Sequence, residues 1–322
     1  MTAEAADPLT SGVRPPNAPL GGAVALPSVT EEPRADAPGP GRVVRHRRPM
    51  WASALLGIAL VAFTVIFVYP FIWLVSASFK PRGEVFDNRL IPHTFTLANY
   101  VQVWREAPMA LWMLNSVIVT VLSAVTVTIT SAMVAWGFSY FRFKGRSALF
   151  GLVLATMMLP GAVTMIPTFL IWKSLGMVGT LTPLWAQNLF GSAFYIFLLR
   201  QFFMALPREL FEAAKIDGAN NWGIFTRIAV PLCRPAMVVT VLFEVQASWT
   251  DLMRALIYLR DSSDFTVPRG LKALLDRYGF GGEWHWEIVV TASVITTIPM
   301  IILFFIGQRH FVQGVATTGS TG

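Results

Sequence analysis

Long stretches without any charged side chain constrain this chain more than any other feature of its sequence. Five such stretches are at least as long as the roughly 20 apolar residues that cross the ~30 Å hydrocarbon core of a bilayer. They cover residues 49–79, 107–141, 147–172, 174–199 and 288–308. A sixth stretch, residues 235–259, is equally apolar in character but contains Glu244, Asp251 and Arg254. The sequence therefore predicts an all-α membrane protein with six transmembrane helices.

Composition excludes several other classes of protein. Apolar residues make up 54% of the chain and charged residues 13%, and the mean hydropathy is +0.57, which leaves too little charge to cover a soluble globule. Cys233 is the only cysteine, so an internal disulfide is impossible. The sequence has no phosphate-binding P-loop, no His-Glu-x-x-His, no Gly-x-Ser-x-Gly and no metal-spaced Cys/His cluster. These absences predict a chain that is not an enzyme, binds no metal and does not itself hydrolyse nucleotide.

The placement of the basic residues predicts the orientation in the membrane. The net charge is +7, and with six spans and a cytoplasmic N-terminus, thirteen arginines and lysines from Arg42 onward lie on the inside. The outer segments, counted through Glu283, hold nine, together with seven acids. Because cytoplasmic loops carry the excess of basic residues, we expect both termini inside the cell.

Three regions follow from these patterns. Residues 1–48 contain eight prolines and no long apolar run, which predicts a disordered cytoplasmic tail, with a regulatory tail as the alternative. Residues 49–314 are predicted to form one six-span domain, and residues 315–322 a short cytoplasmic C-terminal tail. The basic cluster of Arg45, Arg47 and Arg48 adjoins the first span and is expected to lie among lipid headgroups.

Each span is expected to be a single helix. The predicted helices lie at about residues 51–75, 111–138, 147–172, 184–203, 236–259 and 288–307. Pro160 and Pro167 interrupt the third, where proline is typical of a kink whose freed carbonyls find other partners. The kink is equally consistent with a role in transport and with a packing irregularity.

The most informative inner segment, residues 204–234, joins the fourth and fifth spans. Pro207 is suited to the start of a helix, which is predicted to stop near Gly218. Its apolar side would hold Leu210, Phe211, Ala214 and Ile216, which favours a position along the membrane surface. Asn220 or Asn221 would cap a second short helix containing Trp222, Phe225 and Ile228, and Pro231 would end it.

The spacing within this segment resembles a known motif. Glu212-Ala213-Ala214, then Gly218, Ile228 and Val230-Pro231, resembles the cytoplasmic EAA loop of ABC importer permeases, except that the family commonly has Leu where Val230 stands. Further matches are Tyr69-Pro70, Ser76 to Lys80, Asn115-Ser116, Pro160 with Pro167, and Trp249-Thr250-Asp251, which resembles a Trp-Asn-Asp segment of sugar permeases. The ending Gln-Arg-His-Phe-Val-Gln-Gly at residues 308–314 resembles that of maltose-type, MalG-like carbohydrate permeases.

The resemblance covers the chain from about Trp51 onward and implies a function. It implies a permease subunit of a sugar or polyol importer in the inner membrane, which pairs with a second permease. It also implies a cytoplasmic ATPase dimer, which would bind ATP and Mg²⁺ in place of this chain, and an extracytoplasmic solute-binding protein touching residues 80–108 and 261–283. The ATPase would bind the EAA loop at Glu212, Ala213, Ala214, Asp217 and Gly218. The alternative is a surface helix that merely joins two spans.

The charges of the fifth span are candidates for the substrate path. Glu244, Ser248 and Asp251 share one stripe at helical spacing, and ionisable groups in a membrane face a bundle interior or a wet cavity. Asp251 and Arg254 are predicted either to form a structural ion pair or to contact substrate. Glu244 has no expected partner within one turn of its own helix, so it is either a path residue or hydrogen-bonded to a neighbouring helix. Three aromatic side chains are candidates either for stacking on sugar or for packing: Trp249, Phe243 and Tyr258.

Two other classes of protein remain as alternatives. A membrane enzyme requires ionisable groups clustered at one depth, yet His46, His93, His285 and His310 fall in the tail and loops. An ion-coupled secondary transporter or channel would use Glu244, Asp251 and Arg254 but needs no ATPase-docking loop. Within the ABC class, only the matches at residues 249–251 and 308–314 exclude a permease for amino acids or peptides.

Overall fold

The computed structural model describes residues 50–279 and 284–316, with the backbone alone described for residue 50 and residues 309–316. Every regular element within these ranges is helical, as the sequence predicts. The predicted N-terminal tail and most of the predicted C-terminal tail lie outside the described residues. The chain divides into two units, residues 1–58 and 59–322. The packing below concerns the second unit.

Three helices are individually long and apolar enough to cross a membrane. They are α1 (Met50–Ser78), α3 (Met109–Tyr140) and α14 (Trp286–Ala316). Three further pairs of helices also pass this criterion, but each is bent by more than 40° at a short break. The described residues therefore contain three straight candidate spans, or up to six if each bent pair is one span.

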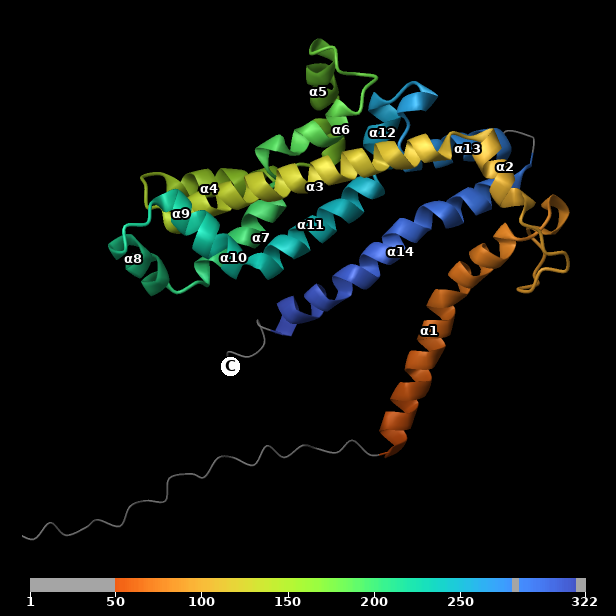
Figure 1. Ribbon diagram of the computed structural model, residues 1–322, viewed down its shortest axis with the longest axis horizontal. Coiled ribbons are helices and arrows are strands. Elements are labelled where there is room, and N and C mark those ends of the chain that lie inside the picture. Colours follow the sequence, from red (N-terminus) through yellow and green to blue (C-terminus); the bar gives the residue numbers. More distant parts are fainter. Residues whose placement is uncertain (1–49, 280–283, 317–322) are drawn as a thin grey trace, which may run out of the picture. The chain divides into compact units, whose positions relative to one another are not determined.

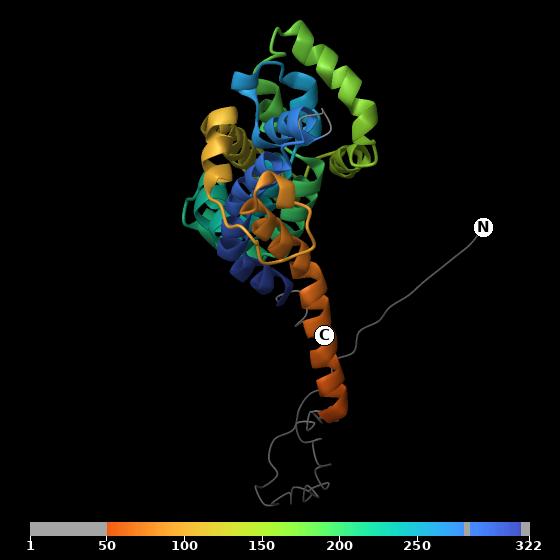
Figure 2. The same ribbon diagram turned by 90° about the vertical axis from the view of Figure 1, so that its right-hand side faces the viewer.

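The third predicted span is broken rather than kinked. It consists of α4 (Arg146–Thr156) and α5 (Gly161–Ser174), whose axes differ by 96° (Figures 1 and 2). The break ends at Pro160, which precedes the first turn of α5 in an extended conformation with ψ 134°. Proline lacks an N–H group and disfavours a helical conformation in the residue before it. The prediction of one continuous helix was therefore wrong, whereas Pro167 is accommodated inside α5.

The fourth and fifth predicted spans are also interrupted. The fourth contains α6 (Thr182–Ala186), the 3₁₀ turn η2 (Gln187–Phe190) and α7 (Ala193–Met204). Gly191 separates η2 from α7 with φ +81°, a conformation that side chains with a Cβ rarely adopt. The fifth divides into α11 (Arg234–Trp249) and α12 (Leu252–Tyr258). In both cases the expectation of a single helix was wrong.

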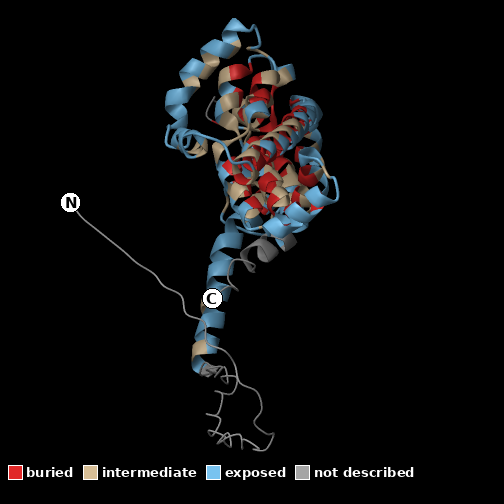
Figure 3. Cartoon of the chain, turned by 90° about the vertical axis from the view of Figure 1, so that its left-hand side faces the viewer, coloured by how far each residue is buried: buried red, intermediate tan, exposed pale blue. Residues whose placement is uncertain are grey.

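Helix α3 is the element around which the second unit packs. It lies against α7 and α11 along much of its length (Figure 1). The buried residues gather inside the helical bundle (Figure 3), and α3 carries 15 of them. The most apolar 18-residue window of α1 has none of its residues buried. Small side chains on α3, including Ala124, Ala132 and Ala135, are almost inaccessible and allow the neighbouring helices to approach closely.

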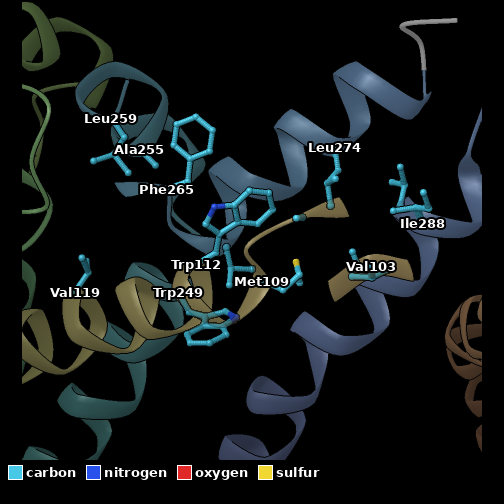
Figure 4. Close-up of a cluster of buried hydrophobic side chains, with 14 of the residues drawn as sticks. Val103, Met109, Trp112, Val119, Trp249, Ala255, Leu259, Phe265, Leu274 and Ile288 are labelled. Carbon is cyan, nitrogen blue, oxygen red and sulfur yellow. The ribbon is translucent and has the colours of Figure 1, made fainter. Parts of the chain in front are cut away.

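One end of α3 is held by short helices and loops. The elements that pack against it are α2 (Ala98–Glu106), η4 (Ser262–Asp264) and α13 (Val267–Leu274). Helix α13 continues into the π-helical turn η5 (Leu275–Gly279), and the short turn η1 (Arg82–Glu84) lies in the loop after α1. Trp112 lies within the apolar cluster here, near Phe265 and Trp249 (Figure 4), and a Cβ on Gly270 would come within 2.1 Å of its ring. Glycine is therefore required where α13 crosses α3.

The Asn115-Ser116 pair has a clear structural role at this end. The Asn115 amide donates to the carbonyls of Ser263 at 2.8 Å and Phe265 at 3.0 Å. The Ser116 hydroxyl accepts from the backbone N–H of Val267 at 2.7 Å. These bonds satisfy buried backbone groups that would otherwise cost free energy, and they fix the loop before α13 to α3.

The loop after α1 is organised by a buried lysine. Lys80 is fully buried and pairs with the Asp87 carboxylate, and it also donates to the carbonyls of Asp87 at 3.2 Å and Arg89 at 2.7 Å. The Asn99 amide donates to the carbonyls of Ser78 at 2.9 Å and Lys80 at 2.8 Å. The Lys80 side chain is thus not exposed to solvent, and its contacts hold the loop together.

Candidate functional site

The segment between α7 and α11 contains the predicted surface helix. Helix α8 (Arg208–Ile216) is preceded by Pro207 and followed by Gly218, which has φ +83°. The N–H of Gly218 donates to the carbonyl of Lys215 at 3.0 Å, and that of Ala219 donates to Ala214 at 2.9 Å. This pair of bonds is the Schellman arrangement that ends helices at a left-handed glycine. The predicted start and stop of this helix are therefore confirmed.

The second helix of the segment starts as predicted but ends later. The Asn220 side chain caps α9 (Asn221–Ile224) by accepting from the N–H of Gly223 at 2.7 Å. The helix continues through the π-helical turn η3 (Phe225–Ala229) and α10 (Val230–Leu232). The helix ends at Leu232, one residue beyond the predicted stop at Pro231. The chain bends by 77° only at the start of α11.

An aromatic cluster fixes α8 and α9 to the end of α3. We call the rings of Trp136, Tyr140, Phe203, Phe211 and Phe225 the aromatic anchor. The Trp136 ring stacks on Tyr140 with centroids 4.4 Å apart and meets Phe211 and Phe203 edge to face at 5.3 and 5.6 Å. Phe225 of η3 completes it at 5.9 Å from Trp136. The anchor joins four elements, α3, α7, α8 and η3, and holds α8 against the end of α3.

Only part of the predicted apolar side of α8 is buried. Phe211 and Ala214 are 6% and 9% exposed, whereas Leu210 and Ile216 are 44% and 87% exposed. Of the five predicted ATPase-coupling residues, four are exposed: Glu212, Ala213, Asp217 and Gly218. Ala214, the fifth, packs against its own chain. The two sides of α8 therefore differ: the side with Phe211 and Ala214 is buried, and the side with Glu212 and Ala213 is exposed.

Glu244 is buried in a polar network between α7, α11 and η2. Its Oε1 accepts from the Asn188 amide at 2.6 Å and from the Ser248 hydroxyl at 2.9 Å, and the Tyr195 hydroxyl also hydrogen-bonds to it. The expectation that Glu244 lacks a partner within one turn of its helix was wrong, because Ser248 lies one turn further on. The network favours the packing alternative for Glu244, since the residue is only 6% exposed.

Asp251 and Arg254 form the predicted ion pair. Asp251 also caps α12 by accepting from the N–H of Arg254 at 3.0 Å, and Arg254 donates to the Leu184 carbonyl at 3.0 Å. The aromatic candidates Trp249 and Tyr258 are 6% and 2% exposed, and Trp249 donates to the Thr296 carbonyl at 3.4 Å. Trp249 and Tyr258 are therefore packed in this chain as core residues.

Sequence reasoning missed Asn188 and Tyr195 in the Glu244 network. They belong to the fourth span, and no local pattern ties them to a residue about 50 positions later. His285, which the sequence placed in a loop, contacts Glu287 at 2.7 Å and Arg82 at 3.1 Å. Among the described residues, no group of three or more His, Cys, Asp or Glu side chains is arranged to hold a metal.

Comparisons with known proteins agree with this architecture. Residues 124–317 match the family of binding-protein-dependent transport system inner membrane components. The chain is 34% identical over 272 residues to the arabinooligosaccharides transport system permease protein AraQ of Halalkalibacterium halodurans, covering 83% of this chain and 95% of that protein. It is 33% identical to the osmoprotective compounds uptake permease protein GgtD of Synechocystis, covering 84% and 93% of the two chains.

A solved structure shares the fold. A crystal structure of a bacterial ABC transporter involved in the import of the acidic polysaccharide alginate matches with a TM-score of 0.74 and 24% identity, over 81% of this chain and 97% of that chain. The predicted permease fold is thereby confirmed, and the family is one of transport components, not of enzymes. None of these comparisons supports a secondary transporter or channel. The chain belongs to the family of binding-protein-dependent inner-membrane transport components and is an ABC importer permease.

Proposed function

We propose that this permease forms one membrane half of an ATP-driven importer for a carbohydrate, either a sugar or a polyol. The similar permeases AraQ and GgtD, named for arabinooligosaccharides and osmoprotective compounds, support this substrate class. The sugar-permease matches at residues 249–251 and 308–314 point the same way. A second permease would complete the path, with six spans in this chain and both termini in the cytoplasm.

The proposed coupling to an ATPase rests on the two sides of α8. Glu212, Ala213, Asp217 and Gly218 are exposed, while Phe211 is held in the aromatic anchor. A separate ATPase dimer would bind the exposed side, and nucleotide-driven closure would pull α3 through the anchor. Such coupling requires the nucleotide to favour one of two states of the assembly, since a ligand shifts an equilibrium only through differential affinity. A solute-binding protein would deliver substrate to residues 80–108 and 261–283, of which residues 280–283 lie outside the described residues.

A bulky side chain at Ala213 tests this docking. Ala213→Trp should reduce both the ATPase that co-purifies and the ATP-driven uptake by roughly ten-fold or more, because close approach needs a small side chain. Thr226→Trp, on the exposed part of η3, is the matched control and should resemble the wild type. Equal ATPase retention in the two variants would contradict the docking proposal.

Gly218 provides a second test of the same segment. Proline fixes φ near −65° and has no N–H, whereas Gly218 has φ +83° and donates to Lys215. Gly218→Pro should therefore abolish uptake while the subunit still inserts. Gly218→Ala, with nothing within 4 Å of its Cβ, should cost only about 1 kcal/mol of backbone strain. Normal ATP-driven uptake by Gly218→Pro would overturn the role of this turn.

For the substrate path, the candidates Glu244, Trp249, Asp251 and Arg254 differ in exposure. The side chains of Asp251 and Arg254 are 17% and 29% exposed, and Arg254 lines a cavity of about 520 Å³ between α5 and α12. We place the first contact with substrate at Arg254. Arg254→Gln should raise the KM of uptake, whereas Met253→Ala, which changes an apolar wall of the same cavity, should leave it near the wild-type value. Unchanged KM in Arg254→Gln would remove it from the path.

The substrate class is tested outside this chain. Cells lacking this permease should lose uptake of the sugars that the cognate binding protein binds in solution, and the wild-type gene should restore it. Binding of amino acids or peptides, but of no sugar or polyol, by that protein would contradict the carbohydrate assignment.

A further inference from the structure

Two adjoining cavities at the α8 end of the bundle are lined by arginine and lysine. The first, of about 500 Å³, lies between the end of α3 and α8 and includes Arg142, Arg146, Arg208, Lys215 and a single acid, Glu212. The second, of about 440 Å³, shares Arg142 and Arg146, adds Arg200, and has no acidic residue in its lining. Both volumes are typical of small-ligand sites. Figure 1 shows the turn between α3 and α4 at the same end as α8 and α9.

The charges of these basic residues are not neutralised within the part of the chain that the structure describes. None of the five forms an ion pair with a described carboxylate, since the described pairs involve other residues. Arg146 and Arg200 are close enough to repel each other electrostatically. Clustered cations without a counterion raise the energy of the folded chain, so an anion that enters the cavities is favoured.

Two guanidinium groups are held in place by contacts with uncharged groups. Arg146 donates to the Phe141 carbonyl at 3.1 Å, and Arg200 donates to the Phe138 carbonyl at 3.4 Å and lies 4.2 Å from the centre of the Phe150 ring. Arginine presents a planar fork of donors that matches phosphate oxygens. Fixed orientation lowers the entropy lost when an anion binds. The arrangement is thus suited to phosphate.

The position of the cavities favours a lipid phosphate. Arg146 opens α4, and Arg200 lies near the end of α7, so both lie at the ends of helices that belong to predicted spans. Phe143 and Phe150 add apolar walls, and the neighbouring Leu149 is 50% exposed. Basic pockets between membrane helices at the cytoplasmic surface bind anionic headgroups.

We propose that Arg142, Arg146 and Arg200 bind the phosphate of an anionic phospholipid headgroup. The membrane position of the site rests on the proposed function above. Because the first cavity also includes Arg208, Glu212 and Lys215 of α8, the bound headgroup bridges α4 and α8 and stabilises the position of α8 on α3. Coupling between ATPase and pore thereby depends on the lipid composition of the cytoplasmic leaflet.

The test compares lipid retained by the purified, assembled transporter in bilayer nanodiscs. Native mass spectrometry should show phosphatidylglycerol retained in preference to phosphatidylcholine. Arg142→Gln and Arg146→Gln should each weaken this retention about five-fold, as expected for roughly 1 kcal/mol per basic residue. Lys144→Gln is the matched control, since it removes the same charge from the same turn but lines neither cavity. Arg142→Lys with Arg146→Lys, which keeps both charges but not the planar forks of donors, should keep only part of the retention.

Several results would overturn the site. Equal retention of the two lipids by the wild type, or an equal loss in Lys144→Gln and Arg146→Gln, would show that the cavity does not select the headgroup. Displacement of phosphatidylglycerol by millimolar inorganic phosphate would assign the site to free phosphate instead. Loss of the ATPase from Arg142→Gln with normal lipid retention would assign the cluster to docking. The retention assay uses neither nucleotide nor substrate, so its failure leaves the proposed transport function standing.

Discussion

Removal of the Phe211 side chain tests how α8 transmits force. Phe211 is 6% exposed and meets Trp136 and Tyr140 edge to face, with ring centroids 5.3 and 5.7 Å away. Burial of a phenylalanine contributes about 2–3 kcal/mol, and each ring pair adds about 1 kcal/mol. Phe→Ala changes at such sites cost about 3–5 kcal/mol. Phe211→Ala should therefore shift α8 from its docked toward an undocked position by roughly 100-fold or more.

The assay is uptake per ATP hydrolysed in proteoliposomes that contain the complete transporter. The ATPase should still co-purify with Phe211→Ala, because the exposed Glu212 and Ala213 are unchanged. Uptake per ATP should nevertheless fall by roughly ten-fold or more, since closure of the ATPase no longer moves α3. Leu210→Ala, at a neighbouring residue that is 44% exposed, should cost less than about 0.5 kcal/mol. Equal uptake per ATP in these two variants would refute the anchor as the route of coupling.

Three further predictions concern buried or paired groups. Glu244→Ala should lower the Tm of the subunit, because it leaves buried donors unpaired at about 1 kcal/mol or more each. Uptake per folded subunit should stay normal. An unchanged Tm with reduced uptake would instead make Glu244 a residue of the substrate path. Lys80 lowers the pKa of Asp87 mainly by donating a hydrogen bond to its carboxylate, so this pair stabilises the loop above about pH 4 and the stabilisation is lost as the pH falls further. Limited pepsin digestion between pH 2 and 4 should therefore show increasing cleavage within residues 81–97, and no increase would contradict the pair. Burial raises the pKa of the Cys233 thiol to about 11, so maleimide should label it at neutral pH only after denaturation, and rapid labelling of the native protein would contradict its burial.

Helix α8 was predictable because its sequence signals are local. Pro207, Gly218 and Asn220 each dictate the backbone within a few residues, and the structure has a start, a stop and a cap at these positions. The continuity of the spans was not predictable in the same way. A charge-free stretch indicates that a segment is apolar, but it does not indicate whether one helix or two fill it. Gly191 sets one such break through a positive φ, which composition alone does not reveal.

The contacts of the candidate substrate-path residues were harder to predict from the sequence. Asn188 and Glu244 are joined only by the packing of η2 against α11, so their contact depends on tertiary structure. Ser248 was different, because its spacing of four residues from Glu244 already places it within reach. The basic cavities likewise combine α3, α4, α7 and α8, and no single segment of the sequence contains them.

The most direct test of the whole account is uptake by the purified transporter with and without its motor. The account predicts that proteoliposomes take up labelled sugar only when the second permease, the ATPase, ATP with Mg²⁺ and the loaded binding protein are all present. A cysteine introduced at Ala213 should then cross-link to the ATPase from the cytoplasmic side. Sugar uptake by this chain without the ATPase, or labelling of that cysteine from the outer side, would contradict the account.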